Sequence, residues 1–325
     1  MLYPLRFQPI YKTAIWGGGR FASFLGRDLP QSDGIAESWE VSAHPDGISV
    51  VANGELAGWT LPQVTEKFRK ALLGKHLRSE RFPLLIKFLD ANKQLSVQVH
   101  PNRHYVRKHA FHDGEKAEAW VILHTEPGSR MVLGFQKPTT RKAAHKAILE
   151  ERLEDILFEV KPKVGECYFL PPGTVHSLGA GILLYEVQQC SNLTFRLYDW
   201  NRIDRNGKRR ELHIEHGIQS LVPKHWNSDP IPPVALEPGR ERLLESRFFC
   251  LERWTLAARS PNLPRRTRLG GDGRCHVLTV LDGELILEGL EGKLVQGDTV
   301  VLPAELSATE IHALRKSMFL EAYLP

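Results

Sequence analysis

The sequence predicts a mainly β protein that contains two copies of one β unit. Short apolar runs with alternating polarity recur along the chain and are separated by turn residues. Helical periodicity is confined to two segments. The spacing of the segment from Gly165 to Pro171 returns in the segment from Gly297 to Pro303, which predicts the second copy.

The predicted strands are short apolar runs bounded by glycine, proline or polar turn residues. Their β-branched and aromatic residues fit a half-buried pleated surface better than a helix. In the first two thirds of the chain these runs span residues 48–52, 83–89, 95–99, 119–123 and 182–187.

Two helical segments interrupt these strands. Thr60 and Gln63 form a capping box around Pro62, and apolar residues at helical spacing follow, which predicts a helix over about residues 60–74. A second amphipathic run predicts a helical segment at about residues 140–157. We expect that segment to be an insertion that packs beside the first β unit.

Composition is that of an ordinary folded protein. The 325 residues are enough for two packed cores, and 42% hydrophobic and 25% charged residues are usual globular values. No apolar run is long enough to span a bilayer and no secretion signal is visible, so we expect a cytoplasmic protein with no membrane partner. Cys167, Cys190, Cys250 and Cys275 form no close pair, as expected of reduced thiols.

The net charge of +5 is compatible with nucleic acid or with a phosphorylated small molecule as partner. Aromatic residues are not interleaved with the basic clusters as they are in single-strand binders, so we expect no nucleic-acid partner. The densest basic cluster surrounds the turn signal at Asn206 and Gly207, which predicts a solvated loop tip. This cluster consists of Arg202, Arg205, Lys208, Arg209 and Arg210.

Four residues of metal-ligand type occur at spacings that suit strands. Gln98 and His100 are two residues apart, so their side chains share one face of a strand while Val97 and Val99 point to the other face. Any one of these ligand candidates alone would more often be an ordinary core or surface residue. Two imidazoles, a carboxylate and an amide oxygen together suit Zn²⁺. The four candidates are Gln98, His100, Glu118 and His176.

The segment around His176 has a turn–strand–turn–strand pattern. Gly165 and Gly173 can supply positive φ where the chain reverses, and Pro171 ends the intervening strand because proline cannot donate to a ladder. His176 then opens the return strand. This pattern resembles the second motif of the cupin superfamily, whose small antiparallel barrels hold one metal ion.

Glutamine in place of the first histidine of the cupin pattern narrows the resemblance to the type I phosphomannose isomerase family, in its short bacterial form. The resemblance is strong over about residues 1–220 and weak beyond them. It is carried by seven motifs, at residues 11–18, 37–44, 95–102, 116–120, 171–176, 185–189 and 194–200.

The resemblance implies two cupin (jelly-roll-like) β-barrels with a small helical segment inserted. Residues 1–222 would form the metal-binding catalytic barrel, with the N-terminal β region and both helical segments. Residues 223–240 would be a linker and residues 241–325 a second, metal-free barrel. The second copy has Glu305 and Leu306 where the first copy has the segment 173–176 that ends in His176. The metal-binding histidine is therefore missing from the second copy, and we expect this barrel to have a structural role.

The resemblance also implies the chemistry. Members interconvert mannose 6-phosphate and fructose 6-phosphate through a metal-assisted cis-enediol proton transfer. Gln98, His100, Glu118 and His176 would bind one Zn²⁺ per chain, with other divalent metals possible. The partner would be a sugar phosphate, and we expect a monomer or a weak homodimer.

The same resemblance suggests the residues that act on the substrate. Ser96, Lys87 and Arg196 would line the phosphate end, and Arg196, Lys116 and Glu186 would be catalytic. Strand alternation also turns Arg196 away from the neighbouring Asp199. The identity of the general base stays open between Lys116 and Glu186.

Three other functions compete with isomerisation. A non-catalytic cupin that binds sugar phosphates would keep the metal and lose the catalytic residues, but all three are present. A metal-dependent dioxygenase is disfavoured by the Gln98 ligand and the phosphate-binding cations. A bifunctional enzyme that also transfers guanylyl groups would need a nucleotide-binding domain for which the chain is too short.

Overall fold

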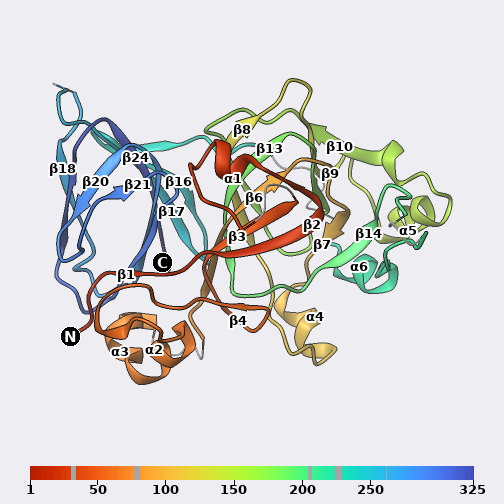
Figure 1. Cartoon of the computed structure of the whole chain (residues 1–325). Coiled ribbons are helices and arrows are strands. Elements are labelled where there is room, and N and C mark those ends of the chain that lie inside the picture. Colours follow the sequence, from red (N-terminus) through yellow and green to blue (C-terminus); the bar gives the residue numbers. More distant parts are fainter. Residues whose placement is uncertain (31–33, 77–80, 204–206, 224–228, 261) are drawn as a thin grey trace.

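The structure is a computed structural model of the whole chain, and it describes every residue except 31–33, 77–80, 204–206, 224–228 and 261. Four main β-sheets are stacked in layers, with short helices at the edges (Figure 1). We call the six-stranded and five-stranded sheets the first unit, and the seven-stranded and four-stranded sheets the second unit.

The first unit is formed by residues from the first two thirds of the chain. Its six-stranded sheet has the order β11 (Cys167–Leu170), β8 (Glu118–Thr125), β13 (Ile182–Gln189), β6 (Leu84–Ala91), β3 (Ile35–Val41) and β2 (Ile10–Gly18). Its five-stranded sheet has the order β10 (Leu157–Val160), β9 (Met131–Phe135), β12 (His176–Leu178), β7 (Val97–Val99) and β14 (Phe195–Tyr198).

The second unit is formed mainly by the C-terminal third. Its seven-stranded sheet has the order β1 (Leu5–Arg6), β22 (Thr299–Leu302), β19 (His276–Asp282), β24 (Ser317–Tyr323), β17 (Cys250–Leu256), β16 (Arg240–Glu245) and β15 (Val234–Glu237). Its four-stranded sheet has the order β18 (Arg266–Leu269), β23 (Thr309–Ala313), β20 (Glu284–Leu287) and β21 (Leu294–Val295).

The remaining elements are short. β4 (Ala43–His44) pairs with β5 (Gly47–Ile48). The α-helices are α1 (Arg20–Ser23), α2 (Leu61–Lys67), α3 (Arg69–Leu73), α4 (Arg103–Lys108), α5 (Arg141–Leu149) and α6 (Ile214–Ser220). The 3-10 helices are η1 (Gly54–Leu56), η2 (Gly74–His76) and η3 (Leu153–Ile156). Among the described helices, none has the length and apolar character needed to cross a membrane.

Apolar side chains fill the space between successive sheets. Inside the first unit, Trp120 of the six-stranded sheet packs in one cluster with Leu133 of the five-stranded sheet. Inside the second unit, Trp254 packs in one cluster with Ile311. The opposite face of each large sheet packs in a third core, in which residues of the six-stranded and seven-stranded sheets lie together. Both faces of each large sheet are therefore buried, because successive side chains of a strand point to opposite faces. That core includes Phe88, Tyr185, Val277, Leu320 and Ala322.

The outer face of the five-stranded sheet is covered by helices. Ala144 and Ile148 of α5 and Ile218 of α6 lie in one cluster with Val97 and Val99 of β7. The valines therefore point away from the inner face of their strand, as the alternation predicts. The inner face is left for Gln98.

The mainly β class that the sequence predicts is confirmed, but the sheets are open rather than closed into barrels. The predicted helix over residues 60–74 consists of α2 and α3, which meet at Phe68. Its capping box is present, because Thr60 accepts a hydrogen bond from the Gln63 amide and Gln63 accepts one from the Thr60 amide. The segment 140–157 contains α5 and η3 and ends where β10 begins.

The predicted domain limits do not coincide with the limits of the sheets. Leu5 of β1 lies opposite Val301 of β22, so the N-terminal end joins the second unit. β15 begins at Val234, inside the predicted linker 223–240. Residues 224–228 of that linker lie outside the described residues. The boundaries 1–222 and 241–325 therefore stay a prediction.

Candidate metal centre

Three buried side chains converge between the two sheets of the first unit. His100 directly follows β7, His176 opens β12 and Glu118 opens β8. Nε2 of His100 lies 3.1 Å from Oε1 of Glu118, and Nε2 of His176 lies 3.6 Å from Oε2 of Glu118. One potential ligand atom from each residue lies within 4.8 Å of the others, and no second group of this kind occurs among the described residues.

Each imidazole is oriented by a backbone carbonyl. Nδ1 of His100 lies 2.9 Å from the carbonyl oxygen of Leu193, and Nδ1 of His176 lies 2.9 Å from that of Thr174. Because a carbonyl oxygen only accepts, each Nδ1 carries the hydrogen and each Nε2 presents a lone pair. This is the arrangement in which a protein backbone orients a metal-binding histidine.

The atoms that face the common point have no hydrogen-bond partner. They are Nε2 of His100, Nε2 of His176 and Oε2 of Glu118, and all three are buried. Buried polar atoms without a partner are costly, so three of them around one point need an explanation. A divalent cation of zinc type would satisfy all three, because imidazole nitrogen and carboxylate oxygen are its usual ligands. The residues present therefore fit a metal ion.

Electrostatics keep the ligands in their metal-binding forms. Burial, helped by the charge of Lys116, lowers the pKa of His100 to about 3, and burial also lowers the pKa of His176. Burial would raise the pKa of Glu118, but Lys116 and His100 outweigh it and hold that pKa well below its usual range. Neutral imidazoles and a charged carboxylate are the states that coordinate metal.

Gln98 lies on the same sheet face as His176. The two residues are directly opposite each other in the pairing of β7 with β12, and Gln98 is also opposite Arg196 in β14. Directly paired residues project to the same side of a sheet. The turn that leads to His176 uses Gly173 with φ of 91°, where a Cβ atom would lie 2.4 Å from Cγ2 of Val222.

Basic and acidic side chains alternate on the facing six-stranded sheet. Lys116 Nζ lies 2.8 Å from Oε1 of Glu118. Lys87 Nζ lies 3.1 Å from Oε2 of Glu37 and 3.6 Å from Oε2 of Glu186. Burial would lower the pKa of Lys87, but Glu186 and Glu37 outweigh it and raise the pKa above its ordinary value. Lys87 is therefore a charged group enclosed by two carboxylates.

Glu186 is the carboxylate whose environment is least favourable to ionisation. Burial, followed by the negative charge of Glu118, raises its pKa well above the usual range. Its Oε1 atom is buried and has no hydrogen-bond partner. A raised pKa makes this carboxylate a stronger base than an ordinary one, which suits a group that accepts and returns a proton.

Ser96, which directly precedes β7, meets Arg196 of the neighbouring strand β14. Nε of Arg196 donates to Oγ of Ser96 at 3.2 Å, and one terminal nitrogen donates to the carbonyl oxygen of Glu211 at 2.7 Å. Asp199 instead pairs with Arg202 and Arg210. Arg196 therefore points away from Asp199, as the strand alternation predicts.

Gln98, Glu118, Lys116 and the other charged groups of the facing sheet line one pocket of about 300 Å³ together with Ser96 and Arg196, whereas the two histidines, Asp199 and Arg202 do not. Its wall contains four basic and three acidic side chains together with two tryptophans. The lining residues are Trp16, Glu37, Lys87, Leu89, Leu95, Ser96, Gln98, Lys116, Glu118, Trp120, Glu186, Asn192, Thr194, Arg196 and Arg210.

Two charged lining residues, Glu37 and Arg210, were not among the site residues predicted from the sequence. The strand β3 contains two glutamates, Glu37 and Glu40, and the sequence does not distinguish the one that faces the pocket. In the structure Glu40 pairs with Arg27, and Glu37 lines the pocket. Arg210 was placed on a solvated loop tip. That prediction is wrong for Arg202 and Arg210, which pair with the buried Asp199, while Arg205 lies outside the described residues.

Comparisons with known proteins agree on one family. A family model described as the catalytic domain of type I phosphomannose isomerase matches residues 4–118. The chain is 36% identical over 299 residues to the mannose-6-phosphate isomerase ManA of Bacillus subtilis, which covers 91% of this chain and 89% of that protein. It is 34% identical over 308 residues to the mannose-6-phosphate isomerase of Streptococcus mutans, with 93% of each covered. The crystal structure of the mannose 6-phosphate isomerase from Bacillus subtilis superposes with a TM-score of 0.88 at 27% identity, over 99% of this chain and 100% of that chain.

Proposed function

The chain belongs to the type I phosphomannose isomerase family, and we propose that it interconverts mannose 6-phosphate and fructose 6-phosphate. The observation that carries this proposal is the set of unpartnered ligand atoms of His100, His176 and Glu118 beside a pocket with four basic side chains. A metal-binding end and a cationic end suit a sugar whose carbonyl lies at one end and whose phosphate lies at the other.

We propose Gln98, His100, Glu118 and His176 as ligands for one Zn²⁺ per chain, with other divalent metals possible. When bound, the ion supplies Lewis-acid polarisation of the substrate oxygens. The neutral imidazoles and the amide of Gln98 leave the carboxylate of Glu118 as the one anionic ligand. Such a site keeps positive charge at the place where an enediolate develops.

Lys116 and Glu186 are the candidates for proton transfer. Isomerisation moves a proton between neighbouring carbons through a cis-enediol, which needs a group that accepts and returns the proton. Glu186 offers a buried oxygen without a partner, and Lys116 is tied to Glu118 at 2.8 Å. We favour Glu186 for the carbon-bound proton and Lys116 for the substrate oxygens, with Arg196 binding the substrate at the far end.

Ser96 and Arg196 are proposed to bind the phosphate. They are joined by a hydrogen bond and line the pocket, and Gln98 of β7 lies between Arg196 and His176 in the register of the five-stranded sheet. Lys87 is enclosed by Glu37 and Glu186, so its charge is largely compensated before any substrate arrives. We propose that Lys87 contacts the sugar and holds Glu186 in place.

The test is a coupled assay of mannose 6-phosphate conversion on purified protein as isolated, after chelation, and after addition of Zn²⁺, Mn²⁺ or Co²⁺. Loss of turnover on chelation and recovery with a metal is the expected result. A folded protein that binds one ion and the sugar phosphate but turns over with none of these metals would replace this proposal with a non-catalytic sugar-phosphate-binding protein.

We further propose a cytoplasmic enzyme of mannose metabolism that is a monomer or a weak homodimer. The described cysteines form no disulfide, which suits a reducing compartment. Light scattering coupled to size exclusion checks the oligomeric state, and a stable higher oligomer would contradict it.

A further inference from the structure

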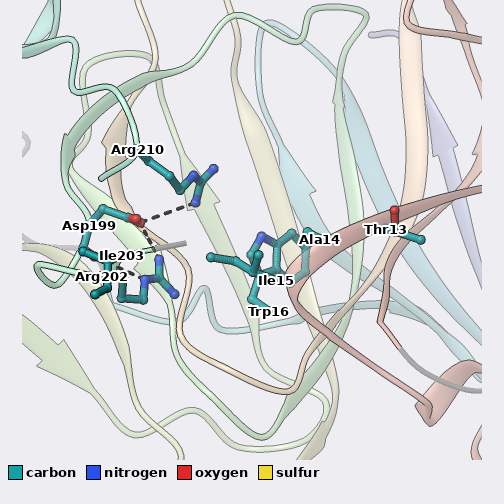
Figure 2. A pocket seen from close by; sticks show the side chains of 8 residues that line it. All are labelled: Thr13, Ala14, Ile15, Trp16, Asp199, Arg202, Ile203 and Arg210. Carbon is teal, nitrogen blue, oxygen red and sulfur yellow. Dashed lines mark hydrogen bonds and ion pairs between the residues drawn. The ribbon is translucent and has the colours of Figure 1, made fainter. Parts of the chain in front are cut away.

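A second hollow adjoins the metal-site pocket. It has a volume of about 340 Å³, and Figure 2 shows its lining side chains. Two of them, Trp16 and Arg210, also line the metal-site pocket. The two hollows therefore share a wall formed by these residues. The full lining consists of Thr13, Ala14, Ile15, Trp16, Asp199, Arg202, Ile203 and Arg210.

Two arginines in this hollow bind the same carboxylate in different ways. Arg202 donates to the carboxylate and the carbonyl oxygen of Asp199 and to the carbonyl oxygen of Gln94. Arg210 has one contact among the described residues, a 3.4 Å approach of a terminal nitrogen to Oδ1 of Asp199 (Figure 2). That distance is at the long limit of a hydrogen bond. Arg202 is therefore fixed, whereas most donors of Arg210 have no partner in the part of the chain that the structure describes.

Positive charge exceeds negative charge at this end of the site. Arg202 and Arg210 pair with the carboxylate of Asp199, which is only 5% exposed. With Arg196, three guanidinium groups stand against two carboxylates here, those of Asp199 and Glu211. Arg196 and Arg210 line the same pocket. Burial and the like charge of Arg210 lower the pKa of Arg196. A dianionic group between Arg196 and Arg210 would relieve this opposition. Lys87 offers no comparable gain, because Glu37 and Glu186 already enclose it.

We propose that Arg210 binds the substrate phosphate together with Arg196 and Ser96, and that it exchanges its weak contact with Asp199 for the phosphate. Asp199 stays paired with Arg202 and keeps Arg210 near the pocket until the substrate arrives. Arg210 is thus a specificity-determining residue that selects phosphorylated sugars. The inference rests on the proposed function.

Replacing Arg210 with glutamine tests the proposal, with Arg209→Gln as the matched control. Arg209 is the neighbouring residue, is exposed and lines neither hollow, so its replacement removes the same charge without removing the contact. Calorimetry measures the binding of fructose 6-phosphate and of inorganic phosphate, and kinetics measures KM and kcat for mannose 6-phosphate.

We expect Arg210→Gln to weaken both ligands and to raise KM roughly tenfold or more, with kcat changed less than about threefold. Arg209→Gln should stay within about twofold of the wild type, and Arg210→Lys should recover part of the loss. A merely structural role would lower kcat as well and would not be rescued by lysine, so that result overturns the proposal.

Equal phosphate affinities of the two glutamine variants would also overturn it. If Arg210→Gln does not fold, Arg210→Lys decides, because the proposal requires its phosphate affinity to lie measurably below that of the wild type. Failure of the proposed function can be told apart from failure of this inference. In the first case the wild-type protein shows no turnover, and calorimetry with inorganic phosphate still reports whether Arg210 binds phosphate.

Discussion

The two large sheets have the same strand order, but their inner faces carry different charges. With β1 left aside, the order β22-β19-β24-β17-β16-β15 repeats the order β11-β8-β13-β6-β3-β2. Leu170 and Leu302 each lie five residues after the glycine of the repeated segment. Leu170 pairs with Glu118 and Leu302 pairs with His276, so His276 occupies the position of Glu118.

The register extends this correspondence across both sheets. Glu186 pairs with Lys87 in the first unit, and Glu321 pairs with Glu252 at the same place in the second. Leu89 follows Lys87 by two residues and lies opposite Glu37. In the same way Trp254 follows Glu252 by two residues and lies opposite Arg240. The first unit thus has lysine where the second has glutamate, and glutamate where the second has arginine.

The second unit satisfies its buried charges internally. Nδ1 of His276 lies 2.7 Å from Oε1 of Glu321, and Nε2 lies 3.0 Å from Oδ1 of Asp272. Trp254 donates to the other oxygen of Glu321 at 2.7 Å, and Arg240 pairs with Glu252 at 2.6 Å. The first unit instead leaves ligand atoms without partners. The same arrangement of strands therefore serves stability where its buried polar atoms are paired, and can bind a ligand where they are not.

The largest expected effect is on a proposed metal ligand. His176→Ala removes one imidazole of the candidate site, and the loss of several kcal/mol of charge stabilisation corresponds to a fall of kcat/KM by roughly a thousandfold or more. His276→Gln, in the second unit, should change kcat/KM less than about threefold. Kinetics and the metal content of each purified variant check this. Similar losses in both variants would break the distinction between the units.

The aligned glutamates provide the next contrast. Glu186→Gln should lower kcat roughly a hundredfold or more, because a proton-transferring group is lost, with little effect on the unfolding temperature. Glu321→Gln should leave kcat nearly unchanged and reduce the free energy of unfolding by roughly 3 kcal/mol, because the buried His276 loses its charged partner. Denaturant unfolding and steady-state kinetics of both variants measure the contrast. A stability loss confined to Glu186→Gln would reverse the assignment.

The histidine of the second unit should make stability depend on pH. Burial would lower the pKa of His276, but Glu321 and Asp272 outweigh it and raise the pKa. The stabilisation is therefore complete below the ordinary histidine value of about 6.5 and is lost as pH rises through the raised value. We expect the free energy of unfolding to fall over that range in the wild type and to fall less in His276→Gln. Identical pH profiles would show that this histidine does not stabilise the fold by its charge.

The smallest effect concerns how the units are held together. Amides of Ala304 and Glu305 in the second unit donate to carbonyl oxygens of Leu72 and Ala71 in α3. Thr60→Ala removes the cap of the preceding α2 and should cost about 1 kcal/mol, with faster hydrogen exchange at residues 304 and 305. Thr140→Ala, which uncaps α5 on the far side of the first unit, should cost as much without that local change. Equal exchange in both variants would argue against α2 and α3 as a link between the units.

Sequence patterns predicted the structure best where a feature depends only on residues close in the chain. Alternation placed Val97 and Val99 in the outer core and Gln98 on the inner face, since neighbouring side chains in a strand project to opposite sides. Glycine with positive φ at positions 165 and 173 followed from the turns that the spacing requires. The capping box at Thr60 followed from local hydrogen bonding alone.

Sequence patterns failed where distant segments meet. The basic residues near position 206 were predicted to be solvated because the pattern shows their neighbours in the chain and not the buried Asp199 that Arg202 and Arg210 bind. The membership of β1 in the second unit was likewise invisible, since a strand of two residues has no periodicity. Nothing in the sequence marked the enclosure of Lys87 by Glu37 and Glu186.

Sequence patterns alone identified β6, β7, β8 and β13, their buried faces, the repeat and the residue types that can bind a metal. These features depend on side-chain alternation and turn chemistry over a few residues. The strand predicted at residues 48–52 is wrong, because only Ile48 belongs to a strand and Val50 and Val51 form isolated bridges. Three features became visible only in the folded chain: His100, His176 and Glu118 meet with unpartnered atoms, Arg210 lines the same pocket as Glu118, and the equivalent positions of the second unit are paired. The reason is that desolvation and charge pairing depend on which sheets face each other, and residues far apart in the chain supply those faces.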